Sequence, residues 1–167
     1  DAVMLSGESA AGDYPVEAVK TMASICVRTE RELRGQDKFK LKTYDASDVA
    51  EAIARSVAHT AKNLDVKTIV AATQSGHTPK MISKYRPSAN IMAITYTERQ
   101  QRALALVWGV QPYVIEKPAS TDEMFKLAND IVLEKGFAEK GELLILTAGL
   151  KIGETGSTNM LKVQKTF

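Results

Sequence analysis

The stretch TIVAATQSGHTPK at residues 68–80 constrains the fold most, because it joins three structural signals without a gap. An apolar, β-branched run of strand length stops in a small polar loop, and helical periodicity resumes directly afterwards, with Pro79 at the first helical position. A strand that leads through such a loop into a helix points free backbone N–H groups and the positive end of the helix dipole at the loop. The stretch therefore predicts a site for an anion such as phosphate.

The rest of the chain repeats this alternation of strands and helices. Strands are expected at about 67–73, 91–95, 111–115, 143–147 and 159–165, and helices at 78–86, 98–108 and 120–136. This order predicts an α/β fold with a mostly parallel five-stranded sheet and helices on both faces. Because no helix separates the last two strands, the final strand is expected to be an antiparallel edge strand.

Residues 1–34 are expected to form a part of their own. An apolar stretch at 1–5 predicts a short strand, a flexible loop follows, and Pro15 opens a helix. One face of this helix is apolar and comprises Val16, Val19, Met22, Ala23, Cys26 and Val27. Because the chain starts inside an apolar run and without a methionine, we expect it to be a fragment of a longer protein.

A linker and a larger domain are expected to follow. Residues 35–45 are polar and lack periodicity, which predicts a linker, and the domain then occupies residues 46–167. Its first helix can be capped by Asp45 or Ser47. The apolar stripe of that helix comprises Val49, Ile53, Val57, Ala61 and Leu64.

Composition excludes several classes of function. The formal net charge of +2 is too small to predict binding to nucleic acid or to an anionic membrane surface. No apolar run approaches the roughly 20 residues that a membrane-spanning helix needs. The single cysteine, Cys26, excludes an internal disulfide and fits a reducing compartment, so we expect a cytoplasmic protein. Two histidines and one cysteine give no zinc-binding pattern.

Two loops with ligand-binding composition follow predicted strands. The first contains Thr73, Gln74, Ser75, Gly76, His77 and Thr78, and the second, at 147–158, contains Lys151, Gly153 and Gly156. If the two strands are neighbours where the strand order reverses, the loops face one crevice that can hold a phosphorylated small molecule. Ordinary turns and helix caps explain the same residues, so both interpretations stay open at this point. His77 can donate to an anion but has no paired carboxylate for acid–base catalysis.

Several motifs resemble the pyruvate kinase family. Residues 1–19, DAVMLSGESAAGDYPVEAV, resemble the closing segment of that family's catalytic barrel. Further on, TQSGHTP (73–79), SKYRP (83–87), WGV (108–110) and GSTN (156–159) resemble its C-terminal domain in the same order. The resemblance covers the whole chain. It implies the last strand and helix of the barrel followed by the regulatory domain of a glycolytic enzyme, which makes pyruvate and ATP from phosphoenolpyruvate and ADP.

The resemblance also implies roles for individual residues. Ser6 and Glu8 match a serine and a glutamate at the edge of the family's active site. The residues that bind Mg²⁺ and the phosphoryl group lie in barrel segments outside this chain, so the chain alone is expected to be inactive and without a cofactor. The parent enzyme would need Mg²⁺ and K⁺. The sugar-phosphate effector site matches residues 73–78 and 151–156, and the family forms tetramers through this domain, so a homo-oligomer is expected.

One departure from the family bears on the effector. Members that respond to fructose 1,6-bisphosphate often carry an arginine at about the position of Met124, and methionine cannot replace its bidentate contacts. Lys126 is close in sequence but points elsewhere on a helix. We therefore expect a monophosphate effector, ribose 5-phosphate or AMP, in preference to fructose 1,6-bisphosphate. The alternatives are a free-standing sugar-phosphate sensor or isomerase, and an assembly module without a ligand.

Overall fold

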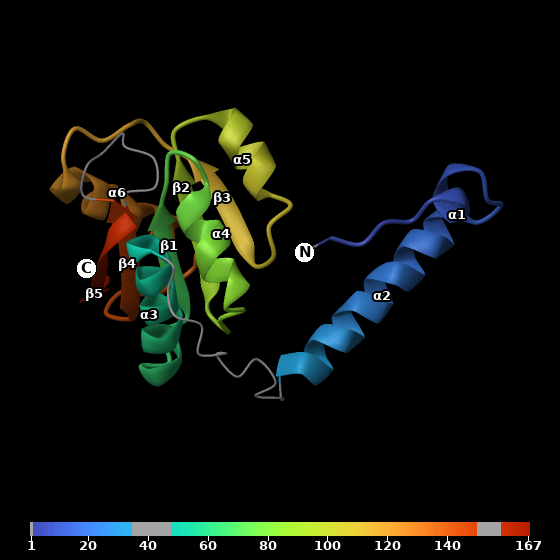
Figure 1. The fold of residues 1–167 in the computed structure, drawn as a ribbon, viewed down its shortest axis with the longest axis horizontal. Coiled ribbons are helices and arrows are strands. Elements are labelled where there is room, and N and C mark those ends of the chain that lie inside the picture. Colours follow the sequence, from blue (N-terminus) through green and yellow to red (C-terminus); the bar gives the residue numbers. More distant parts are fainter. Residues whose placement is uncertain (1, 35–47, 150–157) are drawn as a thin grey trace. The chain divides into compact units, whose positions relative to one another are not determined.

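The protein divides into two compact units, Asp1–Lys42 and Thr43–Phe167. The computed structural model describes residues 2–34, 48–149 and 158–167 (Figure 1). The division falls inside the polar stretch 35–45 that was expected to be a linker. In these described ranges, no helix combines the length and the apolar character needed to cross a membrane.

The N-terminal unit contains two helices, α1 (Gly7–Ala10) and α2 (Pro15–Arg34). Pro15 opens α2 as predicted. Residues 2–6 do not form the strand expected at 1–5, because a strand needs a hydrogen-bonded neighbour and the described part of this unit contains no second strand. The apolar face of α2 is largely uncovered within the unit, with Val16 56% and Val19 53% exposed.

The C-terminal unit is a five-stranded α/β domain. In chain order its elements are α3 (Val49–Asn63), β1 (Thr68–Ala72), α4 (His77–Lys84), β2 (Asn90–Thr95), α5 (Glu98–Leu104), β3 (Val110–Val114), α6 (Thr121–Glu134), β4 (Leu143–Gly149) and β5 (Thr158–Lys165). The strand order is β3-β2-β1-β4-β5. Strands β3, β2, β1 and β4 are parallel, and β5 is antiparallel to β4. The predicted parallel sheet with an antiparallel edge strand is confirmed.

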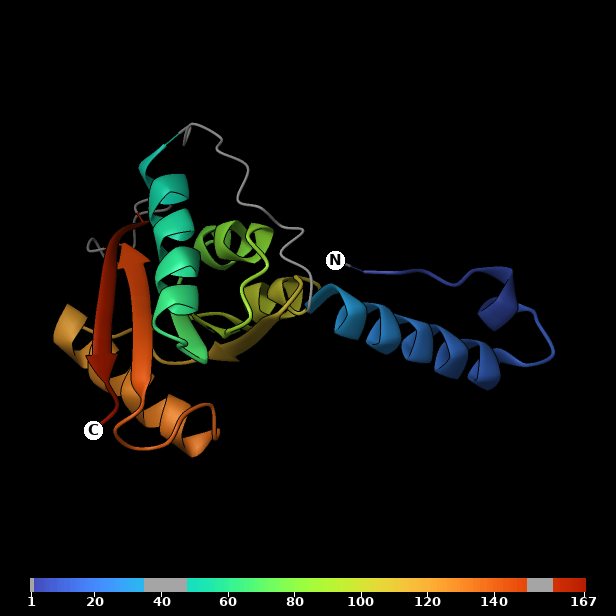
Figure 2. The same cartoon turned by 90° about the horizontal axis from the view of Figure 1, so that it is seen from below.

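Alternating side chains of the strands divide the core between the two faces of the sheet. On one face Ile69, Ile91 and Ile145 are in register on neighbouring strands and pack against α3, α4 and α5. On the other face Val70 and its neighbours pack against Ala128 and Val132 of α6. Figure 2 shows α6 on the opposite side of the sheet from α3. Helices therefore cover both faces, as predicted.

Side-chain caps fix where α3, α5 and α6 begin, and Thr97 caps α5 by accepting from the backbone N–H of Gln100 at 3.3 Å. Asp48 caps α3, where its carboxylate accepts a hydrogen bond of 2.8 Å from a backbone N–H of the first turn. The expected caps Asp45 and Ser47 lie outside the described residues. Ser120 caps α6 by accepting from the backbone N–H of Glu123 at 3.2 Å, and the Glu123 carboxylate accepts from the backbone N–H of Ala119 at 2.6 Å.

The buried face of α3 differs from the predicted stripe. Val49 is 64% exposed and Leu64 is 47% exposed, so the two ends of that stripe do not face the core. The buried residues of the helix are Ala50, Ala54, Val57, Ala58 and Ala61. Alanine favours helix formation and adds little bulk, so this face can lie close to the sheet. The prediction was wrong at the ends of the stripe because it followed the larger apolar side chains.

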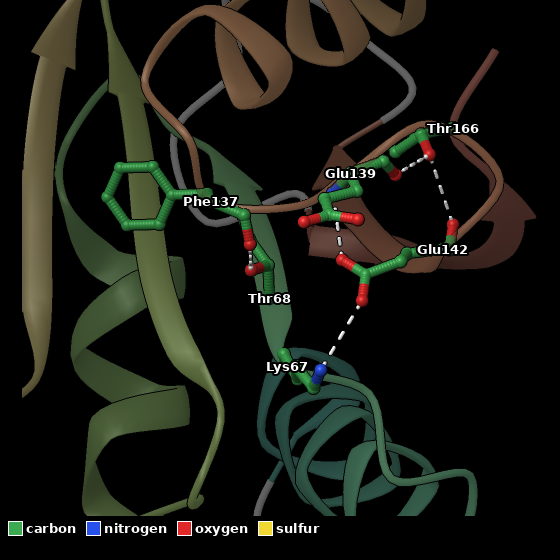
Figure 3. A network of polar contacts seen from close by, with 6 residues as sticks. All are labelled: Lys67, Thr68, Phe137, Glu139, Glu142 and Thr166. Atoms are coloured by element: carbon green, nitrogen blue, oxygen red, sulfur yellow. Dashed lines mark hydrogen bonds and ion pairs between the residues drawn. The ribbon is translucent and has the colours of Figure 1, made fainter.

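Polar side chains close the amino edge of the parallel strands (Figure 3). The carboxylate of Glu142, just before β4, accepts from the backbone N–H of Glu139 at 2.8 Å and from Lys67 Nζ at 3.3 Å. Thr166, just after β5, donates its hydroxyl to the carbonyl oxygen of Glu139 at 2.6 Å. These groups satisfy one another and hold the connection between α6 and β4 against the end of β5.

Glu142→Gln is expected to make the folded chain less stable at neutral pH. The backbone N–H of Glu139, and next the Lys67 ammonium, lower the pKa of the Glu142 carboxyl below its ordinary value of 4.5. A lowered folded-state pKa contributes stability above pH 4.5, and this contribution is lost as the pH falls through the folded-state value. Urea unfolding of both proteins at a series of pH values should show a difference at pH 7 that disappears in acid.

Glu116→Gln is the matched control for this measurement, because Glu116 is exposed and stands outside the network. It should leave stability nearly unchanged at every pH. A difference between wild type and Glu142→Gln that stays constant from neutral to acidic pH would contradict the proposed role of the charge.

Candidate functional site

The strand order reverses between β1 and β4. From β1 the chain proceeds outward to β2 and β3, and β4 then returns to the other side of β1, with Ile69 paired to Ile145 and Ala71 paired to Thr147. Since β1 and β4 are parallel neighbours, Ala72 at the end of β1 and Gly149 at the end of β4 lie at the same edge of the sheet. Ligands of open α/β sheets bind at this kind of position. β1 and β4 are therefore neighbouring strands, as the hypothesis of one crevice requires, while the crevice itself stays a prediction.

The loop after β1 is a tight and mostly buried turn. The backbone N–H of Thr73 donates to the carbonyl oxygen of Ile94 at 2.9 Å, which continues the pairing of β1 with β2. The hydroxyl oxygen of Thr73 accepts from the backbone N–H of Gly76 at 2.9 Å. Gly76 has a φ of +81°, a conformation that favours glycine. Along this loop Gln74 is exposed, whereas Ser75 and His77 are half-buried.

Helix α4 begins at His77, two residues earlier than Pro79 would have indicated. Pro79 is therefore the third helical residue and not the first. It is tolerated there because the N–H groups of a first turn have no acceptor within the helix, so proline removes no helical hydrogen bond. The first turn carries no acidic residue. Its open end thus combines backbone N–H groups, the positive end of the dipole and the hydroxyl of Ser75, which suits an anion.

Helix α5 packs against this loop, and no pattern in the sequence predicts this contact. A side-chain Cβ added at Gly76 would overlap the amide group of Gln100 and would lie 3.1 Å from Leu104 Cδ2. Gln100 therefore helps to fix the shape of the loop. The helical pattern of residues 98–108 predicted a helix but carried no signal for which of its side chains would meet the loop.

A buried pair of hydroxyl groups links α4 to the start of β5. Thr78 Oγ1 lies 2.6 Å from Thr158 Oγ1, and the two residues are 5% and 4% exposed. Thr158 is the first residue of β5 and is paired with Gly149, the last residue of β4. Thr158 stands in the GSTN motif but was not among the predicted site residues. Residues 80 positions apart in the chain are thereby joined at the carboxyl ends of β1 and β4.

The position of Met124 offers no positive charge to this site. Met124 is 4% exposed and packs with Ala72 and Ala148, which lie near the carboxyl ends of β1 and β4. Lys126 is exposed whereas Met124 is buried, in agreement with the expectation that the two side chains face different directions on the helix. The predicted second-loop residues Lys151, Gly153 and Gly156 lie outside the described residues.

Ser6 and Glu8 belong to the N-terminal unit. The carboxylate of Glu8 accepts from the backbone N–H of Ser6 at 3.0 Å. Hydrogen bonds from the backbone N–H groups of Glu8 itself and of Ser6 lower the pKa of this carboxyl. In the parts of the chain that the structure describes, no three histidine, cysteine, aspartate or glutamate side chains gather to bind a metal ion.

Comparisons with known proteins agree on one family. Residues 51–164 match the family described as "Pyruvate kinase, alpha/beta domain". Pyruvate kinases of Geobacillus stearothermophilus and Lactobacillus delbrueckii subsp. bulgaricus are 53% and 51% identical to the chain, over 98% of its length. The chain spans only 28% of the length of these relatives. The crystal structure of a pyruvate kinase from Cryptosporidium parvum superposes with a TM-score of 0.84 at 30% identity, covering 99% of this chain and 33% of that one.

Gly76→Ala is expected to destabilise the fold more than Gly109→Ala does. Both glycines have a positive φ, +81° and +69°, which costs about 1–2 kcal/mol for alanine. Gly109 has no atom within 4 Å of an added Cβ, whereas at Gly76 the side chains of Gln100 and Leu104 must move. This crowding should add about 1 kcal/mol, the low end for overpacking, because the end of Gln100 is flexible.

Urea unfolding of both variants measures the two costs. In a Gln100→Ala background, most of the extra cost of Gly76→Ala should disappear. Equal costs for the two glycine substitutions in the wild-type background would contradict close packing of α5 on the loop.

Proposed function

Since this chain belongs to the pyruvate kinase family and matches its C-terminal alpha/beta domain, we propose that the domain binds a phosphorylated small-molecule effector. The ligand would occupy the carboxyl edge of β1 and β4. The complete enzyme would transfer a phosphoryl group from phosphoenolpyruvate to ADP, giving pyruvate and ATP. In this proposal the effector regulates that reaction from the C-terminal domain.

The placement of the α4 N-terminus carries the proposal. This helix begins beside the reversal of strand order, its first turn has no carboxylate, and Ser75 and Thr78 add hydroxyl groups. Backbone N–H groups and a helix dipole stabilise a phosphate without needing a positively charged side chain. His77, half-buried in the first turn, can donate a further hydrogen bond. By the resemblance to the family, Lys151, Gly153 and Gly156 would close over the ligand from the other loop.

The buried position of Met124 favours a ligand with one phosphate group. A second phosphate would need a second cluster of donors, and Met124 instead contributes to an apolar cluster with Ala72 and Ala148. The proposed effectors are therefore ribose 5-phosphate or AMP, in preference to fructose 1,6-bisphosphate. A methionine cannot supply the charged hydrogen bonds that arginine gives to a phosphate.

Regulation requires only that the ligand bind one arrangement of the enzyme better than another. We propose that the two arrangements differ in how the subunits of a homo-oligomer are placed. The complete enzyme would be a cytoplasmic tetramer. Ser6 and Glu8 would stand at the edge of its active site. By the resemblance to the family, the Mg²⁺ and K⁺ implied for the reaction would be held by residues of the catalytic barrel outside this chain. The chain alone would be catalytically inactive.

A free-standing sugar-phosphate sensor or isomerase is a weaker proposal. A free-standing domain would not explain why the chain is similar to pyruvate kinases over 98% of its length, including the N-terminal unit. An isomerase also needs a base beside the ligand, and within the loop at 73–78 His77 is the one side chain of that kind. The other alternative is a domain that takes part in assembly and binds no ligand. The titration below distinguishes it from an effector-binding domain.

Calorimetric titration of the chain with ribose 5-phosphate, AMP and fructose 1,6-bisphosphate tests the proposal. We expect a monophosphate to bind more tightly than the bisphosphate. Ser75→Ala should weaken that binding about tenfold or more, because a hydrogen bond to a charged group contributes about 1.5–3 kcal/mol. Ser56→Ala, an exposed hydroxyl on α3, should leave the affinity unchanged.

Two results would count against the proposal in different ways. Tight binding of the bisphosphate without monophosphate binding would refute the choice of effector. Failure of all three compounds to bind would refute the effector site and favour the assembly module.

A further inference from the structure

The hydroxyl pair Thr78–Thr158 has one proton more than its own hydrogen bond uses. Each threonine hydroxyl carries one proton and can accept two hydrogen bonds. The pair forms one bond of 2.6 Å in which either oxygen can be the donor. No other described group bonds to either hydroxyl, so the direction of this bond is not fixed by its surroundings. One of the two protons is available for another acceptor.

The direction of this bond decides what the first turn of α4 offers to an anion. If Thr78 donates to Thr158, then Thr78 presents only lone pairs to its other neighbours. If Thr158 donates to Thr78, the proton of Thr78 is free to point elsewhere. A phosphate oxygen accepts hydrogen bonds only, so an anion at this turn is compatible with the second direction.

We propose that Thr158 is a positioning residue of the effector site. This inference rests on the proposed function. With the phosphate bound, the Thr158 hydroxyl donates to Thr78 Oγ1 and the Thr78 hydroxyl donates to a phosphate oxygen. Hydrogen bonds in such a chain polarise and strengthen one another, most of all where the local dielectric is low. Both threonines are more than nine-tenths buried, which meets that condition.

The proposed relay extends the effect of the ligand to the antiparallel edge of the sheet. Thr158 begins β5 and is paired with Gly149 at the end of β4. When the ligand changes which of the two threonines is the donor, the hydrogen bond between Thr78 and Thr158 remains. The contact between α4 and β5 is therefore kept. The ligand therefore stabilises one hydrogen-bond direction at the junction of α4, β4 and β5.

A double-mutant cycle in ligand affinity tests this role. Thr78→Val should weaken binding of ribose 5-phosphate about tenfold or more, since it removes a donor to the anion. Thr158→Val should weaken it less, about three- to tenfold, and Thr158→Ser should stay within about twofold of wild type because it keeps the hydroxyl. The double variant should bind no more weakly than Thr78→Val alone. AMP and inorganic phosphate serve as further probes in the same titrations.

Thr68→Val is the matched control, because Thr68 is also a fully buried threonine with a 2.6 Å hydroxyl hydrogen bond, but at the amino edge of the sheet. It should lower the melting temperature and leave the affinity unchanged. Thr158→Ala removes the hydroxyl without adding a methyl group, so it replaces Thr158→Val if the latter does not fold.

Three outcomes separate the relay from the proposed function itself. Unchanged affinity in Thr158→Val or Thr158→Ala would overturn the relay and leave the effector site in place. Equal weakening by the Thr158 substitution in the wild-type and Thr78→Val backgrounds would also overturn it, because the effect would then be independent of Thr78. Absence of binding to ribose 5-phosphate and to AMP by wild type would remove the effector site as well.

Discussion

The parallel pairing of β1 with strands on both sides is the constraint on which the rest of the domain depends. All five residues of β1 are buried, and Ile69 is in register with both Ile91 of β2 and Ile145 of β4. A strand buried on both faces cannot shift by one residue without exchanging the side chains that face the two sets of helices. This register therefore fixes the core and places the end of β1 beside the end of β4.

The two edges of the parallel strands then use their polar groups differently. At the amino edge Glu142, Lys67 and Thr166 are bonded within the protein. At the carboxyl edge the backbone turns at Gly76 into a helix N-terminus whose N–H groups have no helical acceptor. Among the described residues, the carboxyl edge is where the reversal of strand order meets backbone N–H groups without a helical acceptor. The proposed effector site makes use of this difference between the two edges.

Local sequence patterns predicted most of the fold, and long-range contacts account for what they could not predict. Continuous apolar runs identified β1, β2 and β4, because strands buried on both faces need no alternation, whereas the last strand was predicted from roughly alternating residues at 159–165. The buried face of α3 is rich in alanine and differs from the predicted stripe. The prediction followed the larger apolar side chains, such as Leu64. The contact of Gln100 with Gly76 and the bond between Thr78 and Thr158 join distant parts of the chain. No local pattern encodes such pairs. The loop at 73–78 could be recognised locally, because a strand, a small polar loop and a helix follow one another there without a gap.

The most direct test of the central claim is an amide chemical-shift titration of isotope-labelled chain with ribose 5-phosphate. A ligand held by the N-terminus of α4 should shift the backbone amides of Ser75, His77 and Thr78 most strongly and that of Thr158 next. The amides of Thr68 and Thr166 at the amino edge should hardly change. The largest shifts at the amino edge, or no shifts at the α4 N-terminus under saturating ligand, would contradict a phosphate site where the strand order reverses.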